Sequence, residues 1–392
     1  MRDAAHALEG RVGAVVITGA DMEPPASISG IAADLSLSGP DQEEFRELLA
    51  NLIKDLDQRG HVEVSLSKEE EASLLRHLRG LTLLEAHKIL TKAIIEDGKL
   101  SAEDVQLVVA AKKEVVEREG LLEYFPTDHK LAQIADLVSL KAWLAKRQGV
   151  VREPTRAASY GLQFPRGMLL LGVPGYGKSL SAKAVASEWG LPLLKLDPSN
   201  LYNKFIGESE RNFKRAMRAA ERMAPVVLWI DELEKAFASG GEDGGVSQRI
   251  LGSFLSWMQD RRGDVFIVAT ANDVQKLPPE FLRKGRFDEI FFVDLPNLPT
   301  RRDVFRIHLE GRGQDPELFD LDALARITDG FSGSEIEGVV VAGLYSAFAT
   351  GGALAPHVLI EEAGKTRPLS VTRSEEIAAL RAWARERTVP AN

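Results

Sequence analysis

The sequence predicts an α/β fold: a parallel β-sheet covered by helices, followed by a helical lid and preceded by a smaller, mostly helical module. Three observations predict this arrangement. Short apolar runs typical of buried strands alternate with helical patterns through the middle of the chain. A glycine-rich loop joins the first of these strands to a helix. The N-terminal part repeats pieces of the central pattern in the same order.

Size and composition limit the class of protein. The chain has 392 residues, 44% hydrophobic and 27% charged, as in a globular protein with room for two or three domains. It has no cysteine, which excludes disulfides, thiolate metal sites and cysteine nucleophiles. The formal net charge of −9 argues against nucleic acid as the main partner. With no signal-peptide pattern and no apolar run of about 18 residues, we expect a cytoplasmic protein that does not cross a membrane.

We divide the chain into residues 1–125, 126–299 and 300–392. In the first part, a strand precedes several helical patterns, predicted at 13–18, 41–56, 68–78, 82–96 and 101–118. Residues 15–21 resemble 267–273, and residues 80–85 resemble 330–335 at almost the same offset. We therefore interpret the first part as a partial, degenerate copy of the central module that lacks its glycine-rich loop. The alternative is accidental likeness between short strand-turn-helix pieces.

The central part begins with a helix within 128–147, followed by a polar stretch that predicts a surface loop up to Pro165. Strands are predicted at 168–171, 191–196, 226–230, 265–269 and 290–293. Helical patterns lie between them, at 180–186 and 208–223. Strands that alternate with helices favour a parallel sheet covered on both faces, with the functional site at the carboxyl ends of the strands.

The loop after the first central strand has the spacing of a phosphate-binding loop. Gly172 is followed, four residues later, by Gly177, Lys178 and Ser179. Glycines at 175 and 177 let the backbone amides turn toward phosphates, where the N-terminus of the next helix adds its positive end. Lys178 would neutralise phosphate charge and Ser179 would bind Mg²⁺. An ordinary glycine turn is the alternative. The other predicted contacts of this loop are Pro174, Gly175, Tyr176 and Leu180.

Polar residues that suit catalysis follow the predicted strands at 226–230 and 265–269, and two arginines come later in the chain. Asp231 can hold Mg²⁺ and Glu232 can polarise a water, although an acidic pair after a strand is often only a solvated strand end. Asn272 can hydrogen-bond a γ-phosphate or the attacking water, or it can simply form a turn. Arg283 and Arg286, in one short turn, suit the γ-phosphate of a neighbouring subunit, with surface ion pairs as the alternative.

Together these motifs resemble an AAA+ ATPase of the AAA family proper, over about residues 126–345. The resemblance implies a P-loop NTPase sheet with a helical lid, ATP and Mg²⁺ as cofactors, and Asn272 as sensor one. It also implies that Arg283 and Arg286 are arginine fingers, and that His308 and Gly333 lie near adenine and ribose. The whole arrangement is similar to an AAA branch of cyanobacteria and plastids with a degenerate N-terminal module. The departures from the family pattern are Tyr176 for threonine, Ala135-Asp136 for two glycines and Glu234 for aspartate.

The resemblance further implies a substrate-gripping pore loop at Lys204, Phe205 and Ile206, in which Phe205 projects into a central channel. A core aromatic is the alternative. Residues 239–245 look like a second pore loop or a flexible connection. Lid helices are predicted at 301–309, 321–328, 334–348 and 374–387. We expect a homo-oligomeric ring, a hexamer, in which Mg²⁺-dependent ATP hydrolysis drives remodelling or threading of a protein partner. An ATP-switched scaffold and a nucleic-acid motor remain as alternatives.

Overall fold

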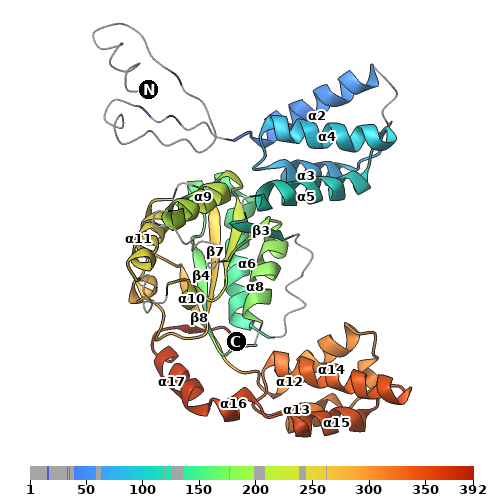
Figure 1. The fold of residues 1–392 in the computed structure, drawn as a ribbon, viewed down its shortest axis with the longest axis vertical. Helices are drawn as coiled ribbons and strands as arrows, with labels where there is room; N and C mark the ends of the chain where they lie inside the picture. The colour runs from blue at the N-terminus through green and yellow to red at the C-terminus, as the bar shows by residue number, and fades with distance from the viewer. Residues whose placement is uncertain are drawn as a thin grey trace.

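The structure of the chain is a computed structural model that describes most of the sequence. The described residues are 39–58, 63–118, 120–125, 136–175, 177–197, 208–237, 244–261 and 263–392, with Val16, Ala33 and Leu35. The predicted pore-loop residues Lys204, Phe205 and Ile206 lie outside them, as do Tyr176, Ala135, most of the predicted strand at 13–18 and most of 239–245. Figure 1 shows a helical module, an α/β body and a helical lid arranged in that order along the longest axis.

The N-terminal module is built from helices that each begin with their own cap. They are α2 (Gln42–Asp57), α3 (Lys68–Leu78), α4 (Leu83–Asp97) and α5 (Ala102–Glu117), and every one starts with a capping box. Two short parallel strands lie beside them, β1 (Glu63–Val64) and β2 (Lys99–Leu100). The helices pack on a core of their own around Phe45, Leu74, Leu78 and Leu90. The predicted helices agree with these bounds to within two residues.

A mixed sheet forms the body of the molecule. Among the described residues its strand order is β3-β5-β6-β7-β4-β8-β9. The strands are β3 (Leu122–Phe125), β4 (Gly167–Gly172), β5 (Leu193–Leu196), β6 (Val226–Ile230), β7 (Val265–Ala271), β8 (Glu289–Val293) and β9 (Val389–Pro390). The five central strands, β4 to β8, are parallel, as predicted. β3 adds an antiparallel edge beside β5, and β9 adds a parallel edge beside β8.

Helices cover both faces of the sheet, which is why its central strands are mostly apolar. β4, β6 and β7 are buried at every position. On one face, α6 (Val138–Arg152) and α8 (Lys178–Trp189) enclose a core that includes Val268. On the other, α9 (Glu208–Arg222) and α11 (Gly244–Asp260) enclose a core that includes Ile267. Adjacent residues of β7 thus point to opposite cores, as the alternation of a strand requires.

The lid follows the sheet. It consists of α12 (Leu298–Glu310), α13 (Leu321–Ile327), α14 (Gly333–Thr350) and α15 (Pro356–Lys365), packed around Phe305, Leu324, Phe331, Val340 and Leu359. Short helices elsewhere are α7 (Pro154–Ser159), within the predicted surface loop, and α10 (Leu233–Ala236), after Glu232. A 3₁₀ turn spans Pro279–Leu282. None of the helices described here is both long enough and apolar enough to cross a bilayer.

The C-terminal segment returns from the lid to the sheet, which the predicted lid helix at 374–387 did not anticipate. After α16 (Leu369–Thr372), α17 (Ser374–Ala384) places Arg381 against Asp294, with a nitrogen–oxygen distance of 2.8 Å. The chain then adds β9 to the sheet edge, where the Ala391 N–H donates to the Phe292 carbonyl at 2.9 Å. The segment therefore links the lid to the strand beside β4.

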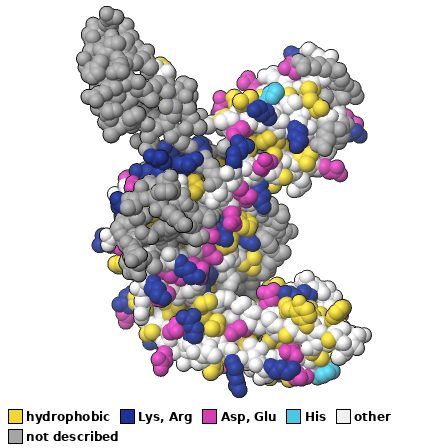
Figure 2. All heavy atoms as spheres, in the orientation of Figure 1, with side chains coloured by type: hydrophobic (Ala, Val, Ile, Leu, Met, Phe, Trp, Pro, Cys, Tyr) yellow, Lys and Arg dark blue, Asp and Glu magenta, His cyan; other side chains and the backbone are white. Residues whose placement is uncertain are grey.

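Charge is distributed unevenly over the surface. Figure 2 shows Lys and Arg side chains gathered over α9, although the chain as a whole is acidic. The basic residues of α9 are Arg211, Lys214, Arg215, Arg218 and Arg222. A negative net charge and a local basic face therefore coexist in this chain.

Candidate active site

A cavity of about 260 Å³ opens at the carboxyl ends of β4, β6 and β7. Its walls bring together three motifs that are far apart in the sequence. They are lined by Pro174, Gly175, Gly177, Lys178, Ser179, Leu180, Asp231, Glu232, Thr270 and Asn272. All except Thr270 are predicted site residues. Ligand sites of open α/β sheets lie at this edge, so the cavity is where the sequence placed it.

Glycines shape the loop that leads into the cavity. A Cβ on Gly172 would lie 2.0 Å from the carbonyl oxygen of Val293, so only glycine lets β4 end this close to β8. Gly175 and Gly177 have φ values of 79° and 69°, in the left-handed region that favours glycine. Gly172 does not line the cavity but allows the loop to start in the right place.

Lys178 is held at the base of the loop. Its side chain is 6% exposed, and its amine donates to the carbonyls of Gly172 at 2.9 Å and Val173 at 2.7 Å. Burial lowers the pKa of Lys178 to about 8, against the opposing pull of the Glu234, Asp231 and Glu232 carboxylates. A lysine with this pKa is mostly protonated at neutral pH, so it supplies positive charge where phosphates would bind.

Ser179 and Asp231 bring two kinds of oxygen together. The Ser179 hydroxyl donates to the Asp231 carboxylate, with oxygen distances of 3.3 and 3.4 Å. Oxygen donors of this type suit Mg²⁺, which usually takes one or two protein ligands and completes its shell with water and substrate phosphates. No cluster of three or more His, Asp or Glu residues able to hold a metal occurs among the described residues.

Glu232 has an unusual backbone and a fully engaged carboxylate. Its φ of 51° is left-handed, which is uncommon for a residue other than glycine. One carboxylate oxygen accepts from the Asn272 side-chain amide at 3.2 Å, and the other pairs with Lys235 at 2.7 Å. The Asn272 N–H in turn donates to Glu234 at 2.9 Å. Asn272 and Glu232 are thus held face to face across two strand ends.

Glu234 is buried behind this pair. It is 4% exposed, and burial raises its pKa, although the hydrogen bond from Asn272 works in the opposite direction. Its second carboxylate oxygen and the Asn272 side-chain oxygen are both buried without a hydrogen-bond partner among the described residues. Both oxygens can therefore still accept a hydrogen bond, and Asn272 lines the cavity.

The lid contacts the phosphate loop through the start of α14. The N–H of Ser334, in the first turn of α14, donates to the Gly175 carbonyl at 2.9 Å. Gly333 therefore lies beside the loop, although neither it nor His308 lines the cavity. His308 is on α12, where burial lowers its pKa and its Nδ1 lies 3.9 Å from the Glu337 carboxylate. The contact of His308 and Gly333 with a nucleotide remains a prediction.

The two predicted arginine fingers are outside the cavity of their own chain. Arg283 is exposed, and Arg286 donates to the backbone carbonyl of Leu255 on α11. They are placed by the 3₁₀ turn and the tight turn that follows it before β8. Their action on a neighbouring subunit remains a prediction.

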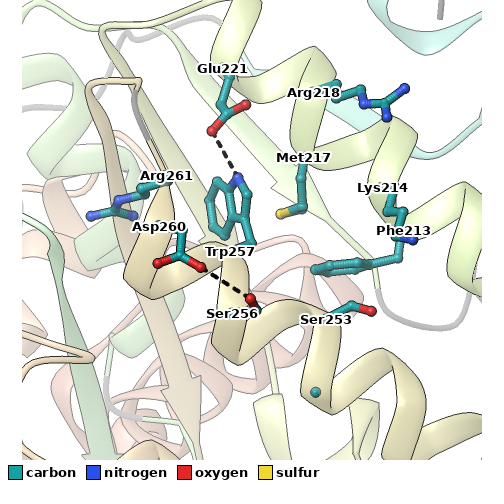
Figure 3. A pocket seen from close by; sticks show the side chains of 11 residues that line it. Phe213, Lys214, Met217, Arg218, Glu221, Ser253, Ser256, Trp257, Asp260 and Arg261 are labelled. Atoms are coloured by element: carbon teal, nitrogen blue, oxygen red, sulfur yellow. Dashed lines mark hydrogen bonds between the residues drawn. The ribbon is translucent and has the colours of Figure 1, made fainter. Parts of the chain in front are cut away.

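A larger hollow, of about 650 Å³, lies between α9 and α11 and contains no predicted site residue. Figure 3 shows Phe213, Met217 and Trp257 in it, with the Trp257 ring nitrogen donating to Glu221 at 3.0 Å. Charged side chains of both signs surround these apolar groups.

Thr270 is the cavity residue that the sequence patterns missed. It stands inside the apolar run of β7, so it looks like an ordinary strand position. The available signal was the position of Thr270 in the sequence, two residues before Asn272. β7 pairs with β6, and the register of this pairing brings Thr270 level with the end of β6.

Two models of known families match parts of this chain. The model of the "ATPase family associated with various cellular activities (AAA)" matches residues 168–295, which contain the phosphate loop, the Asp-Glu pair and Asn272. A second model, "SpoVK-like AAA ATPase, second domain", matches residues 43–119. The mostly helical N-terminal module is therefore AAA-related, as its likeness to the centre of the chain predicted.

Individual relatives extend the match to nearly the whole chain. The "uncharacterized AAA domain-containing protein ycf46" of Trieres chinensis is 36% identical over 373 residues, which is 94% of this chain and 73% of that protein. The proteasome-activating nucleotidase of Aeropyrum pernix is 38% identical over 208 residues, 51% of this chain and 50% of that protein. A cell division cycle protein 48 homolog of Archaeoglobus fulgidus is 28% identical over 327 residues, 78% and 44% of the two chains. The chain belongs to the AAA family and is a nucleotide-binding enzyme that hydrolyses ATP.

Proposed function

We propose that this ATPase forms a homo-oligomeric ring, a hexamer, and uses Mg²⁺-dependent hydrolysis of ATP to remodel or thread a protein partner. One observation carries the proposal. The groups that would bind phosphate and Mg²⁺ and activate water surround a single cavity, while Arg283 and Arg286 stand outside it. Among the relatives, the Aeropyrum pernix protein is named as proteasome-activating, which favours a protein as the partner.

Each residue has a role that follows from its position. Ser179 and Asp231 would hold Mg²⁺, which neutralises phosphate charge when bound. When a nucleotide binds, the Lys178 amine would release the carbonyls of Gly172 and Val173 and donate to phosphate oxygens instead. Glu232 would accept a hydrogen bond from water as that water attacks the γ-phosphorus, with the bond to the ADP oxygen breaking to give ADP and phosphate. Asn272 would orient the same water or the γ-phosphate.

Assembly into a ring is supported by the outer surface of the lid. On α14, Tyr345 is 73% exposed and Phe348 is 86% exposed, while the opposite side of the helix packs in the lid core. A helix that is apolar on all sides is normally buried. A second copy of the chain would cover these aromatic side chains, and the arginines would then face a neighbour's γ-phosphate.

The pore loop completes the proposed machine. Lys204, Phe205 and Ile206 come between β5 and α9 in the sequence. A Phe205→Ala variant separates threading from switched assembly. It should form rings and hydrolyse ATP as the parent does but lose the remodelling of a bound protein. A variant that keeps remodelling would favour the scaffold.

Mixing two inactive variants tests whether subunits share a site. An Arg286→Ala protein should lose about 10³-fold in turnover if the arginine acts in trans. Added Lys178→Ala protein has no working site but supplies Arg286 to its neighbour, so the mixture should regain turnover. The matched control combines Lys178→Ala with Glu232→Gln, because neither then has an intact site and no recovery is expected. If the first mixture stays inactive at every ratio, cooperation between subunits is wrong.

A further inference from the structure

Thr270 connects the two acidic residues of the active site. It lies near the end of β7 and is 1% exposed. Its hydroxyl donates to the Asp231 carboxylate at 2.5 Å and accepts the backbone N–H of Glu232 at 3.0 Å. One side chain on β7 therefore engages both residues that follow β6.

Only a hydroxyl can make both of these bonds at once. It has one hydrogen to donate and two lone pairs to accept with, and here it donates to a carboxylate and accepts from an amide. Valine would have the same shape and make neither bond. Serine would keep both bonds and lose only a methyl group. These two substitutions therefore separate the hydroxyl from the space it fills.

The two bonds act on different features of the site. The Glu232 backbone is in the left-handed region, which persists only where its surroundings hold it. The bond from its N–H to Thr270 is one such restraint, and the same residue presents its carboxylate to Asn272 at 3.2 Å. At Asp231, the Thr270 hydroxyl binds one carboxylate oxygen, Oδ1, which Ser179 also contacts at 3.3 Å. This fixes the rotation of the carboxylate.

We propose that Thr270 is a positioning residue of the ATPase: its hydroxyl sets the Asp231 carboxylate for Mg²⁺ and the Glu232 backbone for activation of water in one joint arrangement. The inference rests on the roles proposed above for Asp231 and Glu232. Groups that orient metal ligands in this way typically contribute about 10–100-fold in metal affinity or activity. Thr270 does not itself touch the reacting atoms.

The test compares Thr270→Val with Thr270→Ser in the full chain. We expect Thr270→Val to lower kcat by about 10–100-fold and to raise the Mg²⁺ concentration for half-maximal turnover, with little change in KM. Thr270→Ser should restore both to within about threefold of the parent, since it keeps the hydroxyl. A Thr270→Val protein with parental kcat and Mg²⁺ dependence, or a Thr270→Ser protein as impaired as Thr270→Val, would overturn the inference.

A control separates this effect from the general loss of a buried hydroxyl. Thr328, in the lid, is fully buried and donates to the Leu324 carbonyl at 2.8 Å. Thr328→Val should lower the thermal unfolding temperature and leave the Mg²⁺ dependence unchanged. If Thr328→Val shifts the Mg²⁺ dependence equally, the effect of Thr270 is merely structural and the inference fails.

A binding measurement makes the inference independent of turnover. ADP affinity is measured with Mg²⁺ and again with a chelator in its place. The gain in affinity from Mg²⁺ should be smaller for Thr270→Val than for the parent, while affinity in the chelator stays the same. If the parent binds Mg²⁺-ADP but does not hydrolyse ATP, the proposed function fails and this gain still decides the role of Thr270. An unchanged gain in Thr270→Val would contradict it.

Discussion

The N-terminal module and the lid are two helical units that share one local motif. Both contain a glycine with positive φ, then a buried apolar residue, then the N-cap of a long helix. These are Gly80, Leu81 and Thr82 before α4, and Gly330, Phe331 and Ser332 before α14. Both caps form capping boxes with a glutamate three residues later. The likeness of residues 80–85 to 330–335 is therefore a likeness in structure, while residues 15–21, except Val16, lie outside the described residues.

The two units dock at different ends of the α/β body, as Figure 1 shows. In the lid, the first turn of α14 donates to the phosphate loop at Gly175. In the N-terminal module, Gly80 lies against Met223, where a Cβ would approach the Met223 side chain to 2.5 Å. The same turn thus meets a nucleotide site in one case and the end of α9 in the other. Location in the fold, more than local structure, decides what this turn contacts.

The outer faces of the units also differ. When α4 and α14 are aligned on their N-caps, Lys88 and Lys92 stand where α14 has Gly338 and Ala342. One turn further, α14 exposes Tyr345 and Phe348, where α4 exposes Ile95 and ends at its C-cap, Gly98. The lid thus exposes two aromatic side chains that suit a contact between subunits, whereas the matching face of α4 combines two lysines with one exposed isoleucine.

The largest expected effect comes from removing the exposed aromatic side chains that distinguish the lid from the N-terminal module. Replacing Tyr345 and Phe348 by serine should weaken assembly by about 2–4 kcal/mol for each aromatic lost, roughly a 30- to 1,000-fold change in the dissociation constant. The matched change in the N-terminal module, Lys88→Ser with Lys92→Ser, should leave assembly unchanged. Sedimentation velocity with ATP measures both. Equal assembly by the two double variants would mean that the apolar face of the lid is not an interface.

The two units also differ in how many hydrogen-bond partners a buried cation has. In the lid, the 5% exposed Arg301 donates to the Ala325 and Pro296 carbonyls at 2.9 Å and pairs with Asp329 at 3.0 Å. In the N-terminal module, Lys112 is fully buried and its amine has no hydrogen-bond partner among the described residues. It lies 5.6 Å from the centre of the Tyr124 ring. The first cation is satisfied and the second is not.

The pKa of Lys112 makes this difference depend on pH. Burial first, and the Arg79 charge second, lower it to about 7. Between pH 7 and the ordinary lysine pKa, the unfolded chain holds a proton that the folded chain has released, so stability rises with pH across that window. Below pH 7 the buried charge destabilises the fold in full.

Two substitutions test the contrast. Lys112→Met should stabilise the N-terminal module by about 1–3 kcal/mol at pH 6 and by less at pH 9. Arg301→Met should destabilise the lid by about 1–3 kcal/mol at both pH values, because two carbonyls lose their donor. Urea unfolding at the two pH values measures them, with the exposed Lys113→Met as the control. A Lys112→Met gain that does not change with pH would contradict the charge argument.

The smallest expected effect concerns the shared caps. Thr82→Ala and Ser332→Ala each remove an N-cap hydroxyl and should each cost about 1 kcal/mol of stability. Only Ser332→Ala should also lower ADP affinity, by about a few-fold. The Ser332 hydroxyl lies 3.2 Å from the Ser334 hydroxyl, and the backbone N–H of Ser334 donates to the phosphate loop. Thermal unfolding and ADP titration measure the pair. Equal loss of affinity in both variants would mean that the contact of the lid with the loop is unimportant.

Much of the site was readable from local pattern. The phosphate loop, the Asp-Glu pair and Asn272 were predicted, and the structure places them around one cavity. Their spacing and flanking apolar runs specify strand ends, and parallel strand ends meet at one edge. Thr270 was not predicted because a single hydroxyl within an apolar strand does not form a recognisable sequence motif. β9 was not predicted because a strand of two residues has no period to detect.

The sequence by itself determined the elements: capped helices, buried strands and glycines with positive φ depend on residues a few positions apart. Tertiary structure alone decided the pairings across the chain. It brought Thr270 to Asp231, Arg286 to the Leu255 carbonyl and β9 to the edge beside β8. Each of these contacts joins two segments whose preference for helix, strand or turn would be met at any place in the fold. The packing of the whole sheet is what selects their partners.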